Sequence, residues 1–274
     1  MKKRTLLTAM LVLTMAAVQA QTTEVLDNEY GARLSLQADK KLAKGLHIFA
    51  EEEIRLDDNF SSFNRLHTTV GITYKALPWL KVGMGYALIN PYSSANKAFK
   101  SARHRLMLDA TAQYQWGHWQ FGLKERLQAT YRSGDMNTYQ APRTAMALKS
   151  RISVKYQGWR RIVPFAAFEL RNTLNAPVVD AFYDGSLYTT VDGYEIAEAG
   201  WFISGWNGTY VNRRRVALGT TYKITRGNSL RFQLLADCIS DKEIDANAAG
   251  TKLKSYTLRK GFVGWACVDY TFSF

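Results

Sequence analysis

Apolar and polar residues alternate with a period of two along most of this 274-residue chain, and this alternation restricts the possible folds more than any other feature. Between residues 80 and 88, one face consists of Leu80, Val82, Met84, Tyr86 and Leu88. Similar alternation occurs in eleven segments, at about residues 30–38, 46–56, 66–75, 80–89, 103–114, 119–131, 145–156, 162–171, 211–223, 230–239 and 262–274. The sequence therefore predicts an all-β fold of antiparallel strands, each with one apolar face.

The connections between these segments distinguish a β-barrel from a β-sandwich, whose strands alternate as well. Short connections lie near residues 40–45, 76–79, 116–118, 157–161 and 225–229. Along the sequence they alternate with long connections near residues 57–65, 90–102, 133–143, 172–210 and 240–260. Short turns at one end and long loops at the other are typical of up-and-down barrels of the bacterial outer membrane.

Aromatic residues gather beside the short connections. The tyrosines that end predicted strands are Tyr74, Tyr114, Tyr156 and Tyr222, and the tryptophans in or next to the turns are Trp79, Trp116, Trp119 and Trp159. Rings with a polar group prefer the boundary between water and lipid, so these residues predict an aromatic girdle on the periplasmic side of a membrane barrel.

The N-terminus has the pattern of an export signal. Residues 1–20 combine a basic start, an apolar run too short to span a bilayer, and small residues before the expected cleavage site. We therefore expect a signal peptide that is removed after Ala20. Residues 21–274 are then expected to form one domain, a transmembrane β-barrel in the cell outer membrane.

The C-terminus supports the same location. The last segment alternates up to a terminal phenylalanine. Its residues Tyr270, Phe272 and Phe274 resemble the terminal-strand signal by which the barrel assembly machinery recognises outer-membrane barrels.

The number of segments conflicts with the even strand number that is usual for single-chain bacterial barrels. If the long loops lie outside the cell, the first segment runs toward the periplasm, and an earlier crossing before Tyr30 is missing. We therefore expect about twelve strands, with ten as the alternative.

The face of each strand that does not meet lipid lines the lumen of a barrel. The predicted lining residues are Glu51, Glu53, Arg55, Arg103, Arg105, Asp109, Lys124, Arg126, Lys149, Arg151, Lys155, Glu169, Arg171, Arg213, Arg215, Arg231, Asp237 and Asp269. Twelve of these are basic and six are acidic, in line with a net charge of +13 for the whole chain. Either arginine–carboxylate networks fill the lumen, or surplus positive charge selects anions in a narrow pore.

The alternation also predicts the direction of individual side chains. Glu52 and Glu125 fall on apolar faces, where a bulge, a position near the membrane surface or a neighbouring partner would each explain a carboxylate. Cys238 is expected to point outward and Cys267 inward, so we predict two free thiols.

The long connection at 172–210 differs in composition from the rest of the chain. Residues 172–212 contain no lysine or arginine and many aromatic residues. Their acidic residues are Asp180, Asp184, Asp192, Glu195 and Glu198. Such a loop could fold inward and constrict a basic lumen by charge complementarity, or it could form an extracellular lid with a small hairpin of its own.

Several short motifs resemble a known family. They are Glu53-x-Arg55, Arg103-His104-Arg105, Lys124-Glu125-Arg126, Arg151, Pro164-x4-Glu169, and Arg213-x-Arg215 with Gly219-x2-Tyr222. In these the chain resembles the bacterial outer-membrane β-barrel family catalogued as a domain of unknown function, number 2490. The resemblance implies an outer-membrane barrel and supplies no activity, cofactor or catalytic residue.

Catalytic and metal sites have little support in the sequence. Membrane-embedded acyl hydrolases need a serine beside an oriented histidine, and none of His47, His67, His104 and His118 stands in a His-x-Ser arrangement. No cluster of His, Cys and carboxylate residues has the spacing of metal ligands. We predict no catalytic residue, no metal and no cofactor, and an acyl hydrolase is the third interpretation.

The favoured function is a structural or weakly conducting outer-membrane barrel whose basic lumen passes small anions. The alternative is a surface-binding or adhesive barrel that acts through the acidic, aromatic loop 172–210. Expected partners are outer-membrane lipid, lipopolysaccharide phosphates near Lys97 and Lys100, the barrel assembly machinery and small anionic solutes, but not nucleic acid.

Overall fold

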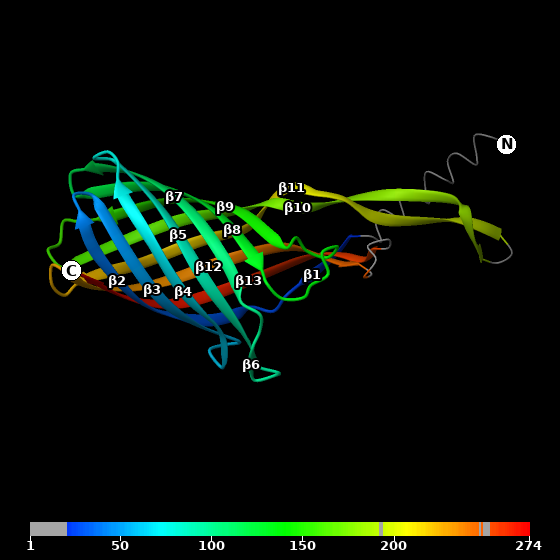
Figure 1. The fold of residues 1–274 in the computed structure, drawn as a ribbon, viewed down its shortest axis with the longest axis horizontal. Coiled ribbons are helices and arrows are strands. Elements are labelled where there is room, and N and C mark those ends of the chain that lie inside the picture. The colour runs from blue at the N-terminus through cyan, green and yellow to red at the C-terminus, as the bar shows by residue number, and fades with distance from the viewer. Residues whose placement is uncertain (1–20, 192–193, 247, 249–252) are drawn as a thin grey trace.

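The computed structural model describes the backbone of residues 21–191, 194–246, 248 and 253–274, and the side chains of 23–178, 205–246, 248 and 255–274. The chain forms a closed β-barrel (Figure 1). Its strands are β1 (Gln21–Val25), β2 (Glu29–Ala43), β3 (Leu46–Asp57), β4 (Ser62–Lys75), β5 (Leu80–Ser93), β6 (Ala98–Phe99), β7 (Arg103–Trp116), β8 (Trp119–Arg132), β9 (Thr144–Tyr156), β10 (Ile162–Val191), β11 (Tyr194–Lys223), β12 (Asn228–Ala246) and β13 (Leu253–Ser273). Within this described part, no helix is long and apolar enough to cross a membrane.

Eleven strands, β2–β5 and β7–β13, form the barrel wall. Each pairs antiparallel with the next, and β13 closes the barrel by pairing parallel with β2, from Val263 opposite Glu29 to Ser273 opposite Asp39. An odd number of alternating strands leaves the first and last strands running in the same direction, so the closing pair must be parallel. The eleven alternating segments are thus the whole wall, and the expected numbers of twelve or ten strands are wrong.

The segment before β2 does not supply another crossing. β1 pairs parallel with residues 256–260 of β13, which precede the residues paired with β2. β1 therefore runs in the same direction as β2. The predicted signal peptide, residues 1–20, lies outside the described residues.

The short connections join β2–β3, β4–β5, β7–β8, β9–β10 and β11–β12 at one end of the barrel, which also holds the C-terminus (Figure 1). We call this the turn end, and the opposite end the loop end. Two connections expected to be long loops are mostly strand: residues 172–210 continue β10 and β11, and residues 240–260 continue β12 and β13.

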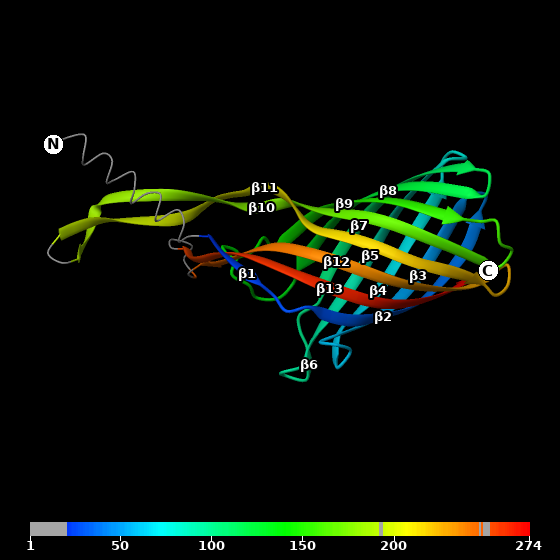
Figure 2. The same cartoon turned by 180° about the vertical axis from the view of Figure 1, so that it is seen from behind.

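The β10–β11 extension leaves the wall as a two-stranded ribbon (Figure 2). β9 pairs with β10 only as far as Thr173, and β12 pairs with β11 only from Arg213 onward. Beyond these residues neither face of the ribbon borders a lumen. Regular alternation is therefore not required there. Of the two alternatives for residues 172–210, the hairpin matches this backbone, but the ribbon is long and extends away from the wall (Figure 2).

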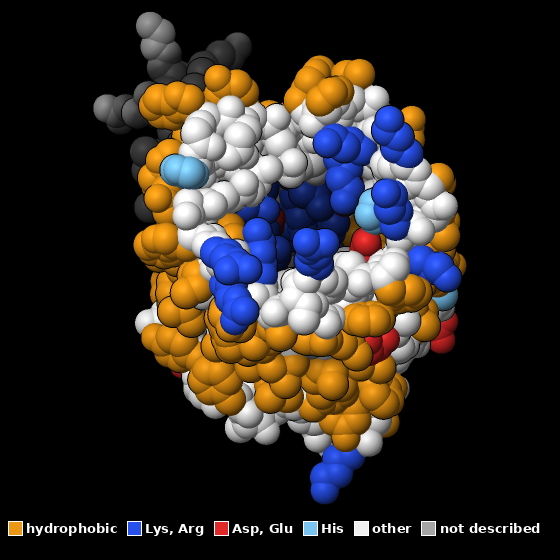
Figure 3. All heavy atoms as spheres, turned by 90° about the vertical axis from the view of Figure 1, so that its left-hand side faces the viewer, with side chains coloured by type: hydrophobic (Ala, Val, Ile, Leu, Met, Phe, Trp, Pro, Cys, Tyr) orange, Lys and Arg blue, Asp and Glu red, His pale blue; other side chains and the backbone are white. Residues whose placement is uncertain are grey.

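The wall has an apolar outside and a charged inside. Among the outward side chains, Leu234 is 68% exposed and Leu218 is 58% exposed. The space-filling view along the axis shows apolar side chains around the outer surface and basic side chains inside the mouth at the turn end (Figure 3). Cys238 is exposed, Cys267 is buried, and both are free thiols, as the alternation predicts.

Candidate functional site: the charged lumen

Two cavities border the charged side chains of the lumen, one of about 440 Å³ near the turn end and one of about 340 Å³ deeper in the barrel. They are continuous, because residues line both: Gln37, Glu51, Lys124, Arg126, Arg151 and Arg231. Ten basic and six acidic side chains line the two cavities. Six of the basic and three of the acidic side chains line the larger cavity. The smaller cavity adds four basic residues and three acidic ones: Arg33, Arg55, Lys149, Arg215, Glu53, Glu169 and Asp269.

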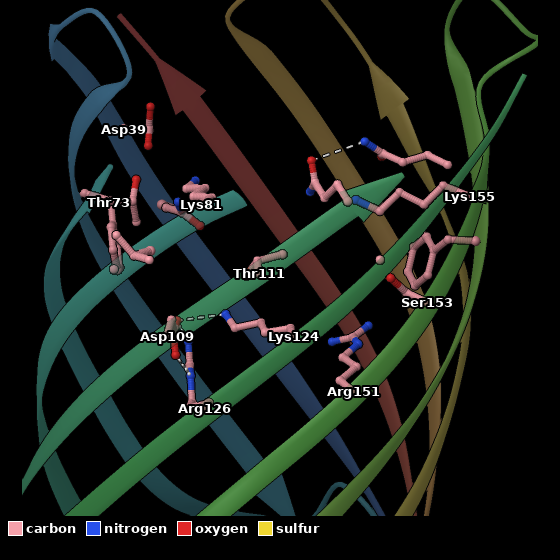
Figure 4. Close-up of a pocket in the computed structure, with 18 of the residues that line it drawn as sticks. Asp39, Thr73, Lys81, Asp109, Thr111, Lys124, Arg126, Arg151, Ser153 and Lys155 are labelled. Atoms are coloured by element: carbon pink, nitrogen blue, oxygen red, sulfur yellow. Dashed lines mark hydrogen bonds and ion pairs between the residues drawn. The ribbon is translucent and has the colours of Figure 1, made fainter. Parts of the chain in front are cut away.

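The larger cavity is organised around Asp109 (Figure 4). This carboxylate on β7 accepts two hydrogen bonds from the Arg126 guanidinium on β8, at 2.7 and 2.8 Å. It also lies 2.9 Å from the Lys124 ammonium. Lys155 and Lys81 project into the same cavity from β9 and β5, closer to the mouth (Figure 4).

A network centred on Asp237 lies deeper in the barrel. Arg215 donates two parallel hydrogen bonds to Asp237, at 2.5 and 2.7 Å, and its third nitrogen lies 3.5 Å from Glu169. The guanidinium groups of Arg213 and Arg33 lie 3.7 and 3.9 Å from the same Asp237 carboxylate. Asp237 is only 1% exposed, so three arginines compensate one buried carboxylate.

A second pair stands on β3, three strands from β12 around the wall. The Arg55 Nε atom donates to Glu53 at 2.6 Å, and the His67 ring lies 3.5 Å from the same carboxylate. The Arg33 guanidinium stacks over the Trp265 ring at 4.2 Å from its centroid. Side chains from β2, β3, β4 and β13 thus meet in the middle of the barrel.

Toward the loop end the barrel contains buried polar side chains. Among them are Gln128 on β8 and Asn212 on β11, which are 3% and 2% exposed. The β8–β9 loop reaches across to the end of β12, where Asn137 donates to the Ala246 carbonyl at 3.0 Å and Gln140 donates to Asp245 at 2.6 Å. These contacts connect the β8–β9 loop to β12 at the loop end. The turn end has an open mouth (Figure 3).

Most of the charged residues predicted to line the lumen border the two cavities. The exceptions are five residues of the loop-end half: Arg103, Arg105, Arg171, Arg213 and Asp237. Sequence reasoning missed Arg33 and Lys81, although both have the same strand phase as the predicted lining residues. Simple alternation from Ser35 and from Gly83 would have found them.

The acidic residues proposed to constrict the lumen lie on the ribbon. The backbones of Asp180 and Asp184 belong to β10, and those of Glu195 and Glu198 belong to β11; their side chains and Asp192 lie outside the described residues. The ribbon backbone points away from the mouth (Figure 1). This course does not favour an inward constriction.

The two outward carboxylates have cross-strand partners. Thr68 donates to Glu52 at 3.1 Å, and Ser150 donates to Glu125 at 2.6 Å. A neighbouring hydrogen-bond donor, one of the three explanations considered, therefore accounts for both. His104 is also outward, with its Nδ1 atom 2.6 Å from the Tyr86 hydroxyl. No group of three or more His, Cys, Asp or Glu residues that could hold a metal ion occurs in the described part of the chain.

Residues 31–247 match the model of a family described as "Protein of unknown function (DUF2490)". The chain belongs to the DUF2490 family. The matched residues run from β2 to just past the end of β12, and they include every charged residue predicted to line the lumen except Asp269. The DUF2490 match therefore covers the networks described above. No curated protein matches the chain.

Proposed function

We propose that this protein is an integral outer-membrane barrel whose basic lumen opens toward the periplasm and is filled toward the cell exterior. It acts as a largely closed barrel that admits small anions from the turn end. The observation that carries this proposal is the division of the wall into an apolar outside and a charged inside. In water, exposed residues such as Leu234 and Leu218 would form a large apolar surface, whereas lipid solvates them.

The aromatic residues support the orientation. At the turn end, Trp116, Trp79 and Tyr114 are 68%, 54% and 67% exposed. Tyr156 contacts the rings of Trp119 and Trp159, with centroids 5.0 and 5.4 Å apart. A ring of exposed tyrosine and tryptophan is the arrangement expected at the periplasmic surface of the membrane. Phe272 and Phe274 stack at 5.2 Å at the end of the proposed assembly signal.

Planar bilayer recordings test the filled lumen. We expect long closed periods with rare, small, anion-preferring steps, because the Asp237 network and the residues beyond it occupy the path. Protease protection of the reconstituted barrel is the control for insertion. Large and steady conductance, or a preference for cations, would contradict the proposed lumen.

The ribbon favours a second function, surface binding. It extends β10 and β11 beyond the wall, and its sequence has five acidic residues and no basic one. An acidic ribbon on a basic barrel suits a partner with a basic surface. Deleting residues 178–206 is expected to leave folding and conductance unchanged and to abolish adhesion of vesicles that contain the barrel to polylysine-coated surfaces. Unchanged adhesion would exclude this function.

A further inference from the structure

The register between β8 and β9 places like charges directly opposite each other. Lys124 faces Arg151, and two residues along the strands Arg126 faces Lys149. All four have the inward strand phase. Side chains in such pairs have Cβ atoms about 4.5–5.5 Å apart, and like charges at that separation are destabilising. We call Lys124, Arg126, Lys149 and Arg151 the cationic quartet.

Nearby carboxylates compensate only half of the quartet. Asp109 binds both Lys124 and Arg126. Glu169 stands opposite Arg151 on β10 and is the second carboxylate beside the quartet, although its ion pair, at 3.5 Å, is with Arg215. Arg215 itself donates two hydrogen bonds to Asp237. In the part of the chain that the structure describes, Lys149 and Arg151 form no ion pair. The close-up shows Arg151 pointing into the cavity beside Lys124 and Ser153 (Figure 4).

The quartet is accessible from the mouth at the turn end. Lys124, Arg126 and Arg151 line both cavities, and Lys149 lines the inner one. The other charged residues shared by the two cavities are Arg231 and Glu51, which balance each other. Asp109 and Glu169 are the two carboxylates beside the quartet, because Arg215 is already balanced by Asp237. Four cations with these two carboxylates leave a local surplus of two positive charges beside a hollow of several hundred cubic ångströms.

We infer that the cationic quartet binds the phosphate group of a small solute that enters the lumen at the turn end. A phosphate group carries about 1.5 to 2 negative charges at neutral pH, which matches the surplus. The Arg151 guanidinium can bind two phosphate oxygens in a fork, and Lys149 adds a point charge. The hydrogen-bonded wall of β8, β9 and β10 separates the quartet from the outer surface, which favours a dissolved phosphate over a lipid headgroup.

The inference deepens the proposed function, and it rests on that proposal only for the side of entry. It is tested by thermal unfolding of the full chain, folded in detergent, with inorganic phosphate or with sodium chloride at equal ionic strength. Phosphate is expected to raise the unfolding temperature in a saturable way, whereas chloride is not. In Arg151→Gln, relief of the like-charge pair is expected to raise the unfolding temperature without phosphate, while phosphate affinity falls at least tenfold.

Arg160→Gln is the matched control, because it removes the same charge from an exposed turn residue outside both cavities. It is expected to retain the phosphate response. Lys149→Gln repeats the test should Arg151→Gln fail to fold. Absence of a saturable phosphate effect on the wild type, or equal loss in Arg151→Gln and Arg160→Gln, would overturn the inference. Phosphate binding by a chain that fails to insert into vesicles would refute the membrane proposal and leave the site standing.

Discussion

Replacing Asp237 with asparagine is expected to lower the free energy of unfolding by about 3–5 kcal/mol, the usual effect of removing one partner from a buried charge network. Asp237 accepts two hydrogen bonds from Arg215 and also faces Arg213 and Arg33. Without its charge, three guanidinium groups remain together in a nearly enclosed region. Urea unfolding of the barrel in lipid vesicles, followed by tryptophan fluorescence, measures the loss.

Asp135→Asn is the control for this experiment. Asp135 is exposed in the β8–β9 loop, so its neutralisation is expected to change the free energy of unfolding by less than about 0.5 kcal/mol. If Asp237→Asn changed it no more than this control does, the Asp237 network would not hold the lumen together.

The second large effect is expected on the outer wall. Leu234→Arg in the middle of β12 places a charge where we propose lipid, and it is expected to lower the free energy of unfolding in vesicles by about 2–4 kcal/mol. The neighbouring Gln233→Arg points into the inner cavity, where water and carboxylates solvate the added charge, so its effect is expected to be below about 1 kcal/mol.

This pair distinguishes a membrane barrel from a water-soluble one. Leu234 is 68% exposed, so in a water-soluble barrel arginine at this position would be neutral or favourable. Equal stability of Leu234→Arg and Gln233→Arg would contradict lipid contact on the outer wall.

The period of two made much of the barrel predictable. Because side-chain direction in a strand depends only on odd or even position, one correct phase assigns a whole strand, as with Glu51, Glu53 and Arg55 on β3. The outward direction of Glu125 followed from the same rule, even though its partner Ser150 was unknown.

Features that depend on pairing between strands were not predictable. The parallel direction of the closing pair follows from an odd number of strands. The sequence contains eleven alternating segments, but we expected twelve or ten strands because single-chain bacterial barrels usually have an even number. The register between neighbouring strands places Lys124 opposite Arg151 and Arg215 opposite Asp237. Register cannot be read from the alternation within a single strand. A small hairpin was one of the alternatives for residues 172–210, but the length and course of the ribbon were not predictable, because a two-stranded segment with solvent on both faces needs no alternation.

The most direct test of the membrane barrel is accessibility along one strand. Spin labels placed one at a time at residues 230–236 of β12, in a Cys238→Ser, Cys267→Ser background, are measured in vesicles with oxygen and with a water-soluble nickel complex. Labels at Leu230, Phe232, Leu234 and Ala236 should collide mainly with oxygen, which concentrates in lipid. Labels at the intervening positions should collide much less with oxygen. Equal accessibility to the nickel complex on both faces would show that the wall does not stand in a membrane.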